Sequence, residues 1–411
     1  MERESNKPYV NVPETIHQPP SRKKVEKIIR NVADRIIQET RYGFRVNGKE
    51  YKEVPDNDQF ESVKLLSGHT DWKYWNGVIN IGMFRLGEEL NEKKYIKHPS
   101  DFFRFAFDNL GFFKKLFDNR VPEAPFHQYF RMDRLDDCGA LGAALIEAIQ
   151  GDENSEKYNQ RVEETAEYIL NKQDRLEDTT FVRKRFNRTT MWADDLYMSV
   201  PFLSRYYNYS GNINFLDDAI KQVKNFHKRL FSEITGLYYH CWYAESDTFG
   251  VAHWGRANGW VAMAVCDLLD KMPSSHPERG DIIRILLKQI IGFSRYQTRN
   301  GMWRQLLDKE DAWHESSVTA MFTYAVARAV NNEWIENIYS SIAVNGWKGL
   351  SENISAEGEL DNVSTGFNIK QDLPFYYNIP VEKGGAHGLG AVLLAGSEML
   401  KLKEYRDCLW C

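Results

Sequence analysis

Two kinds of helical segment alternate along the chain, and this alternation limits the possible folds more than any other feature of the sequence. The first kind is amphipathic, as between Ser21 and Thr40, where apolar residues recur at helical spacing and charged residues occupy the opposite face. The second kind is apolar on most faces, as in the stretch that opens with Trp75, Asn76 and Gly77. Because a helix that is apolar all round must be covered on every side, the second kind is expected inside the first.

Six segments of each kind follow one another in turn. The amphipathic segments begin near Ser21, Pro99, Glu156, Asn214, Gly280 and Glu333. The apolar segments begin near Asp71, Leu135, Trp192, Arg256, His314 and His387, and equivalent positions in them lie 55 to 71 residues apart. A repeat of about 60 residues that pairs one exposed helix with one buried helix predicts an all-α fold, an (α/α)6 barrel of six inner and six outer helices.

The barrel is expected to take up nearly the whole chain. We predict a single barrel domain over residues 23–411, preceded by an N-terminal arm over residues 1–22. Strand signals are sparse, and only the alternating stretches at 235–246 and 300–309 are expected to form small ribbons at one rim.

Charge and composition argue against several classes of protein. The 411 residues carry a net charge of −5 with acids and bases interspersed, and no basic stripe suggests nucleic acid or an anionic membrane as a partner. No apolar run approaches the roughly 18 residues of a membrane span, and the polar N-terminus lacks the apolar core of a signal peptide. We therefore expect a cytoplasmic monomer, or a periplasmic one if an export signal has been removed.

Neither a metal ion nor another cofactor is predicted. The ten histidines are dispersed, and the sequence contains no HExxH, GxGxxG, GxxxxGK[ST] or GxSxG pattern. Cys138 and Cys266 fall in apolar segments and are expected to be free buried thiols. Cys408 and Cys411 form a lone CxxC pair at the end of the chain, which is weak evidence for metal or redox chemistry.

Polar and aromatic residues collect at the starts of the apolar segments. If the inner helices share one direction, these starts meet at one face of the barrel. Indole rings stack on sugar rings while carboxylates bind hydroxyls, so the pattern favours a carbohydrate pocket. The residues concerned are Trp75, Asn76, Asp136, Asp137, Trp192, Asp194, Asp195, Trp254, Arg256, Asn258, Trp260, Trp313, His314, Glu315 and His387, with His240, Trp242 and Trp303 in neighbouring loops.

Some of these residues also have a structural explanation. Asn76 and Asn258, each taken alone, are explained by helix capping or packing, and Asp is itself a favoured N-cap residue. For Asp194 and Asp195, which follow Trp192 directly, we expect one to cap the helix and the other to face a cavity. Two carboxylates brought close together cannot both ionise easily, so one would keep its proton and could serve as a general acid.

Seven blocks of sequence carry a resemblance to a known family. They are WNGV, LDDCGALGAAL, MWADDLYMSVPF, LYYHCWYAES, HWGRANGW, HESSVTAMF and GGAHGLGAVLLA, in this order between about Trp75 and Leu400. In these blocks the chain resembles the unsaturated glucuronyl and rhamnogalacturonyl hydrolases of glycoside hydrolase families 88 and 105, with family 105 the closer. The resemblance also implies the (α/α)6 barrel.

The resemblance assigns roles to individual residues. It implies that Asp194 is the catalytic acid, Asp137 the second acid and His240 a supporting residue, and it places Trp192, Arg256 and Trp260 in the pocket. Asp195 stands where the family often has Gly, so the choice between Asp194 and Asp195 stays open, although the blocks favour Asp194. The full set of substrate-binding candidates is Trp192, Arg256, Trp260, Trp75, Asn76, His387 and Trp313.

The resemblance further implies the reaction. Its substrates are oligosaccharides left by polysaccharide lyases, which end in a uronic acid with a C4=C5 double bond. Protonation at C4 produces a cation at C5, water adds there, and the hemiketal collapses to release the remaining sugar. We expect Arg256 or His240 to bind the uronate carboxylate, or Arg256 to pair with Asp137 or Asp194 instead. Asp137 and burial against Trp192 are expected to hold Asp194 protonated. Activity should therefore change with the titration of Asp194 at a pH of about 5 to 7.

Other functions stay open at this point. A polysaccharide lyase or a sugar epimerase on the same barrel would need a Tyr or His base, and Tyr376, Tyr377 and His387 lie near the end of the chain. A non-catalytic carbohydrate-binding barrel would have aromatic residues without acids that transfer protons, and the acid pairs argue against it.

Overall fold

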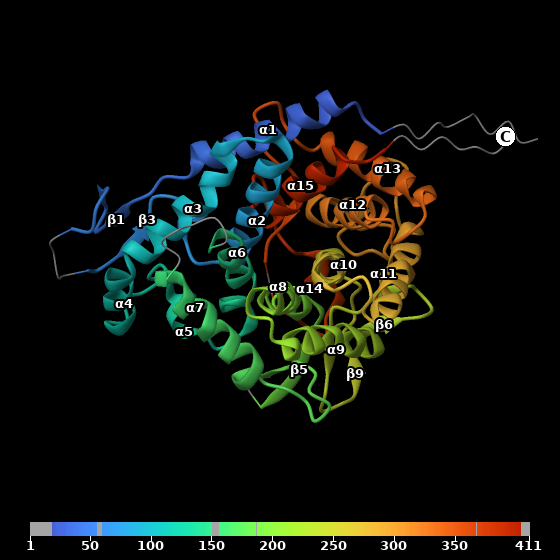
Figure 1. The fold of residues 1–411 in the computed structure, drawn as a ribbon, viewed down its shortest axis with the longest axis horizontal. Helices are drawn as coiled ribbons and strands as arrows, with labels where there is room; N and C mark the ends of the chain where they lie inside the picture. The colour runs from blue at the N-terminus through green and yellow to red at the C-terminus, as the bar shows by residue number, and fades with distance from the viewer. Residues whose placement is uncertain (1–18, 56–59, 150–155, 186, 367, 404–411) are drawn as a thin grey trace, which may run out of the picture.

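Two rings of helices, one inside the other, form the body of the protein (Figure 1). The computed structural model describes residues 19–55, 60–149, 156–185, 187–366 and 368–403. The outer helices of this part are α1 (Arg22–Glu39), α3 (Lys93–Asp108), α7 (Glu156–Glu167), α9 (Ile213–Leu230), α11 (Arg279–Ser294) and α13 (Ser340–Ser351). The inner helices are α2 (Tyr74–Leu90), α6 (Gly139–Ile149), α8 (Val200–Ser210), α10 (Gly255–Lys271), α12 (Ser316–Asn331) and α15 (Ala386–Met399).

The inner helices form a closed ring. Each packs against the next along the chain, from α2 through α6, α8, α10 and α12 to α15, and α15 packs back against α2. The outer helices α3, α7, α9, α11 and α13 each cover the inner helix that precedes them, whereas α1 covers α15. Arg22 in α1 donates from Nη1 to the carbonyl oxygen of Leu400, 3.0 Å away, which ties the first helix to the end of the last. The predicted (α/α)6 barrel is confirmed.

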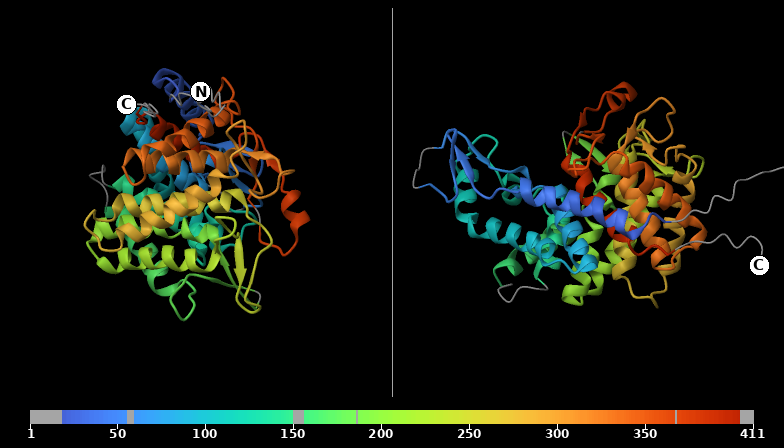
Figure 2. Two further views of the ribbon diagram at one scale, coloured as in Figure 1. Left: turned by 90° about the vertical axis from the view of Figure 1, so that its right-hand side faces the viewer. Right: turned by 90° about the horizontal axis from the view of Figure 1, so that it is seen from above.

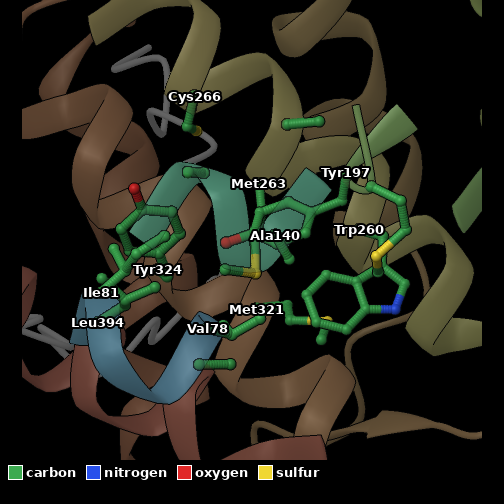
Figure 3. Packing of buried hydrophobic residues seen from close by; sticks show 14 of the residues in the cluster. Val78, Ile81, Ala140, Tyr197, Trp260, Met263, Cys266, Met321, Tyr324 and Leu394 are labelled. Carbon is green, nitrogen blue, oxygen red and sulfur yellow. The ribbon is translucent and has the colours of Figure 1, made fainter. Parts of the chain in front are cut away.

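Glycines allow the inner helices to approach one another closely. A Cβ atom on Gly139, at the start of α6, would overlap the carbonyl oxygen of Met198, which lies just before α8. A Cβ atom on Gly390 in α15 would lie 2.6 Å from the carbonyl carbon of Val78 in α2. Larger residues fill the axis further along, where Trp260, Met263 and Met321 pack together (Figure 3).

The acid pairs lie in tight turns that precede the helices, not in the helices themselves. A buried helix was expected directly after Trp192, but Trp192 ends strand β5 (Arg188–Trp192), the 3-10 turn η4 (Ala193–Leu196) follows, and α8 begins only at Val200. In the same way η2 (Leu135–Asp137) precedes α6. Pairing of β5 with a neighbouring strand keeps Trp192 extended, which delays the helix.

Short strands lie in the loops that precede inner helices. One sheet has the order β4-β5-β8-β9, and three two-stranded ribbons are β6-β7, β10-β11 and β12-β13. The ribbons predicted at 235–246 and 300–309 are confirmed, because β7, β8 and β10 lie in these stretches. The bounds are β4 (Arg183–Arg185), β6 (Phe231–Ser232), β7 (Leu237–Tyr238), β8 (Cys241–Tyr243), β9 (Thr248–Phe249), β10 (Trp303–Arg304), β11 (His314–Glu315), β12 (Val363–Ser364) and β13 (Val381–Glu382).

A small sheet stands at one side of the barrel and was not anticipated from the sequence (Figures 1 and 2). Its strand order is β2-β1-β3, and Phe44 of β1 packs against Phe112 and Phe113 of α4. These strands are too short for a clear alternation of polar and apolar residues. The bounds are β1 (Phe44–Val46), β2 (Lys49–Tyr51), β3 (Val63–Leu65), α4 (Leu110–Asp118), α5 (His127–Arg131), α14 (Leu373–Tyr377), η1 (Gly68–Thr70), η3 (Tyr168–Lys172) and η5 (Asn337–Tyr339).

The remaining predictions concern the ends of the chain, the cysteines and the absence of a membrane span. Residues 1–18 of the predicted arm, and Cys408 and Cys411, lie outside the described residues. Cys138 and Cys266 are free and buried, as predicted. None of the helices in the described ranges combines the length and apolar character needed to cross a membrane.

Replacing Gly139 should test the close approach of α6 and α8. We expect Gly139→Ala to lower the free energy of unfolding by about 3 kcal/mol, because the added methyl group forces the Met198 backbone away. Gly111→Ala in α4 is the matched control, since nothing lies within 4 Å of its Cβ position. This control should change the free energy of unfolding by no more than about 0.5 kcal/mol, because Gly111 lies in the first turn of α4 and its added methyl group meets no neighbour. Urea unfolding of both variants measures the difference, and equal stabilities would contradict the packing described.

Candidate active site

Asp194 and His240 face each other in the rim that precedes α8. Nε2 of His240 lies 3.1 Å from Oδ2 of Asp194. The sheet explains this proximity, because β5 pairs with β8 and the Ala193 amide donates to the carbonyl oxygen of His240 at 2.9 Å. His240 is fully buried, while 14% of the Asp194 side chain is exposed. The structure therefore brings two of the predicted site residues, Asp194 and His240, close together.

Arg183 joins two carboxylates at this point, and it was not singled out from the sequence. Its Nη2 atom lies 2.6 Å from Asp195 and 2.9 Å from Asp136, and its Nε atom donates to Asp195 at 3.0 Å. The guanidinium also lies 4.1 Å from the centre of the Trp192 ring. A basic residue in the strand that pairs with the start of β5 is the signal that could have found it, because the register places Arg183 opposite Thr190, two residues before Trp192.

Burial and charge distinguish the two adjacent acids. Asp195 is 1% exposed and is held by Arg183, whereas Asp194 keeps exposed surface. Burial raises the pKa of Asp195, Arg183 opposes this effect only in part, and Asp136 and Asp194 add to it. Burial also raises the pKa of Asp194, but His240 and Arg183 outweigh it and bring this pKa below its ordinary value. The expectation that Asp194 is held protonated therefore does not agree with the structure of the free protein.

Asp136, and not Asp137, lies with this group. Asp137 is fully buried and forms an ion pair with Arg131, which donates to its carboxylate from Nη2 and, at 2.9 Å, from Nε. The amide of Asp133 donates to the same carboxylate at 3.1 Å. Burial raises the pKa of Asp137 even though Arg131 opposes it. The expected coupling of Asp137 to Asp194 is absent from these contacts, because the 3-10 turn η2 directs adjacent side chains to different sides.

Aromatic rings surround the acids. Tyr74 lies close enough to Asp136, Asp194, Arg183 and Arg256 to feel all four charges, and burial raises its pKa. The imidazole of His387 lies 4.8 Å from the ring of Trp75 and 5.7 Å from that of Tyr74. Trp75, Trp192 and His387 are all half-buried, so these three predicted substrate-binding residues keep surface at the rim. Tyr74 was missed, although it directly precedes Trp75 at the start of α2.

Arg256 does not face the acids. It is 1% exposed, and it donates from Nη1 to the carbonyl oxygen of Ser364 at 2.7 Å and from Nη2 to that of Thr365 at 2.5 Å. It therefore fixes the chain segment 364–365, and neither a direct contact with substrate nor the alternative pairing with Asp137 or Asp194 agrees with these bonds. The i, i+4 spacing between Arg256 and Trp260 correctly predicted that both lie on one face of the helix. It could not show that the guanidinium binds the backbone of a distant segment.

Three further predicted binding residues have other surroundings. Trp260 is 1% exposed, and its ring lies 4.6 Å from that of Tyr197 and 6.1 Å from that of Tyr74, so it belongs to the core. Figure 3 shows it beside Tyr197 among other buried residues. Asn76 is buried, and its Nδ2 atom donates to the carbonyl oxygens of Gly68 and Asp71, so it fixes the turn before α2 and has the packing role considered above. Trp313 is half-buried in the loop between β10 and β11.

The opposite ring nitrogen of His240 meets a residue from a distant segment. The hydroxyl of Tyr376, in the short helix α14, lies 2.8 Å from Nδ1 of His240. Tyr376 is fully buried. Across the described ranges, no three His, Cys, Asp or Glu side chains are grouped as ligands for a metal ion.

An (α/α)6 barrel with a partly exposed carboxylate, a buried histidine and aromatic rings at one rim defines a carbohydrate-active protein. Residues 44–403 match the sequence profile described as Glycosyl Hydrolase Family 88, and the chain belongs to this family. It is therefore a glycosidase.

Comparisons with individual proteins agree with this assignment. The unsaturated rhamnogalacturonyl hydrolase YesR of Bacillus subtilis (strain 168) is 26% identical over 254 residues, which are 60% of this chain and 72% of the relative. A solved structure from Klebsiella pneumoniae, described as a possible member of family GH105, has a TM-score of 0.76 at 22% identity and covers 97% of this chain and 98% of its own. A polysaccharide lyase structure also matches, with a TM-score of 0.63, 17% identity and coverage of 93% and 98%. At these identities the structures show the fold alone.

Replacing Arg183 should test whether it neutralises the buried acids. We expect Arg183→Met to lose about 3 to 5 kcal/mol of unfolding free energy at pH 8, because it leaves buried carboxylates without a cation. The loss should shrink at pH 5. Without the guanidinium nothing opposes burial, Asp136 and Asp194, which all raise the pKa of Asp195, so the folded state binds the extra proton and stability falls as pH rises.

The neighbouring Arg185 provides the matched control for this experiment. It pairs at 3.0 Å with Asp133, whose side chain is 51% exposed, and such surface pairs contribute about 0 to 1 kcal/mol. Urea unfolding of Arg183→Met and Arg185→Met at both pH values gives the comparison. A loss in Arg183→Met that is the same at pH 5 and pH 8 would contradict the electrostatic role.

Proposed function

We propose that this protein removes a 4,5-unsaturated uronic acid from the non-reducing end of oligosaccharides produced by polysaccharide lyases. Membership of the glycosidase family and the similarity to an unsaturated rhamnogalacturonyl hydrolase support the reaction class. The observation that carries the proposal is the partly exposed Asp194 carboxylate, held against the buried His240 and close to Arg183 and Trp192. This arrangement suits delivery of a proton to a sugar carbon beside an aromatic wall.

In the proposed reaction Asp194 is the general acid. The unsaturated ring is a vinyl ether, and a proton from Asp194 adds at C4 and leaves positive charge at C5 and the ring oxygen. Nearby carboxylates stabilise this cation, and Asp136 and Asp195 supply negative charge around Arg183. Asp194, now ionised, accepts a proton from the water that attacks C5. The hemiketal formed there opens and releases the sugar.

Substrate binding is expected to raise the pKa of Asp194, so that its carboxylate takes up a proton from the solvent. In the free protein the pKa of Asp194 is lowered, so the group is ionised near neutral pH. The uronate brings a further negative charge to a site that already contains Asp136 and Asp195. A like charge nearby favours the protonated form of a carboxyl group, so the pKa of Asp194 should rise in the complex.

We assign Arg256 an indirect part in binding. Its bonds to the carbonyl oxygens of Ser364 and Thr365 fix the start of a segment that continues to Gly366. A Cβ atom on Gly366 would lie 3.1 Å from Nε2 of His387, so this backbone borders the aromatic rings. Arg256 therefore shapes the wall of the pocket and leaves contact with the sugar to other groups.

A lyase reaction on the same barrel is less well supported. It would need an ionised Tyr or neutral His base that reaches the substrate. Burial raises the pKa of Tyr74 and of Tyr376, so both hydroxyls keep their protons, and Tyr376 is also fully buried. Burial lowers the pKa of the half-buried His387 to about 3, so this imidazole is neutral, and the absorbance assay distinguishes a lyase reaction from the proposed one.

Loss of the ultraviolet absorbance of an unsaturated disaccharide tests the proposed activity. We expect turnover by the wild-type protein and a fall of about three orders of magnitude in kcat for Asp194→Asn, because an amide cannot donate the proton. Asp137→Asn is the matched control, and it should keep most of its turnover if the protein remains folded. A lyase would instead create absorbance from a saturated polymer. The proposed activity would be contradicted if the wild-type protein left the absorbance unchanged.

The pH dependence should differ between the two kinetic constants. A general acid is active when protonated, so activity falls as pH rises through its pKa. The limb of kcat/KM reports the free enzyme, where the pKa of Asp194 is lowered, and the limb of kcat reports the complex. We therefore expect the basic limb of kcat at higher pH than that of kcat/KM. Coincident limbs would show that substrate binding does not protonate Asp194.

The setting in which the protein works is also part of the proposal. We propose a cytoplasmic monomer that needs no nucleic acid or membrane partner, on the basis of the charge pattern described above. Light scattering of the eluting protein during size-exclusion chromatography measures the mass, and a dimer mass would contradict this part alone.

A further inference from the structure

His240 lies between two groups that differ in what they can donate. Asp194 is ionised in the free protein and can only accept a hydrogen bond at its oxygens. Burial raises the pKa of Tyr376, so its hydroxyl keeps a proton to donate. In neutral imidazole one ring nitrogen carries hydrogen and the other accepts. The arrangement that satisfies both neighbours has Nε2–H directed at Asp194 and Nδ1 accepting from Tyr376.

Packing keeps the imidazole ring in place but does not select between its two tautomers. The ring of His240 lies 4.9 Å from that of Trp254 and 5.8 Å from that of Trp192. One of these contacts is edge-on and the other is tilted, and neither depends on which ring nitrogen carries the proton. Selection therefore falls to the polar groups at the two nitrogens.

The segment that carries Tyr376 is held by several bonds to the barrel. Glu315, at the start of α12, accepts from the Ser364 amide at 3.0 Å, next to the carbonyl oxygen that Arg256 binds. Gln305, after β10, donates to the carbonyl oxygen of Tyr376 itself at 3.1 Å. Strand β12 pairs with β13 and closes the segment at its far end. Buried groups from α10, from the N-cap of α12 and from the loop after β10 thus fix where the Tyr376 hydroxyl lies.

We propose that Tyr376 is a positioning residue for the reaction: its hydroxyl donates to Nδ1 of His240 and keeps the imidazole in the tautomer that presents Nε2–H to Asp194. The consequence for the reaction rests on the proposed function, whereas the tautomer itself does not. Tyr376 is fully buried and acts through His240, without contact with the sugar.

The test replaces Tyr376 by Phe in the full-length protein labelled with 15N in histidine. In the wild-type protein, at a pH where the imidazole is neutral, we expect the His240 spectrum to show hydrogen on Nε2 and none on Nδ1. In Tyr376→Phe the Nδ1–H form should become populated. His240→Gln identifies the resonances by their disappearance. These spectra need no substrate, so they test the tautomer even if the proposed activity is absent.

Kinetics give the second readout. We expect Tyr376→Phe to lower kcat by about 10 to 100-fold, the usual range for a group that orients a functional ligand or base, and to leave KM within about twofold. Tyr377→Phe is the matched control. The Tyr377 hydroxyl binds Asp311 at 2.8 Å and is directed away from His240, so its removal should leave spectrum and kcat unchanged.

Three results would overturn the proposal. One is a wild-type spectrum with hydrogen on Nδ1 of neutral His240. Another is a His240 spectrum that is the same in Tyr376→Phe as in the wild type. The third is a change in KM as large as the change in kcat, which would place Tyr376 in substrate binding.

Discussion

The structure depends on the close approach of six inner helices around one axis. A ring of this size closes only if backbones come within reach of one another at the ends of the helices, and Gly139 and Gly390 lie at two such contacts. Bulkier groups such as Trp260 then fill the space along the axis. Because the ring is rigid and closed, the loops that precede the inner helices are brought to one rim, where strands and turns direct the functional side chains.

Arg183 organises the charges of that rim. Three carboxylates would repel one another strongly in a buried setting, and one guanidinium contacts two of them and stacks on Trp192. Asp195 is thereby committed to structure, which leaves Asp194 as the acid with exposed surface. The division of labour between adjacent residues thus comes from the turn that separates them and from the partner that each one meets.

The fold could be predicted from the sequence because the spacing of apolar residues in each helix is a local pattern, which can be recognised without knowledge of distant contacts. Asp194 and His240 could be expected in one site because both fall in sequence blocks that resemble a known family. The separation of Asp136 from Asp137 could not, since it depends on the 3-10 turn η2 and on Arg131. Contacts between distant segments could not be predicted from the sequence either. Examples are those of Arg183 with Asp136, Arg256 with Ser364, and Tyr376 with His240. The sign of the pKa shift of Asp194 was wrong for the same reason, because His240 and Arg183 outweigh burial.

The contact between α1 and α15 has a consequence for how the protein is made. The first helix covers the last inner helix, and α2 needs α15 to complete its own packing. A ribosome synthesises the N-terminal helices first. Their apolar faces therefore stay exposed until α15 has been synthesised. Contacts between such distant residues slow folding and expose apolar surface to aggregation in the meantime. We expect the nascent chain to rely on chaperones until α15 has left the ribosome.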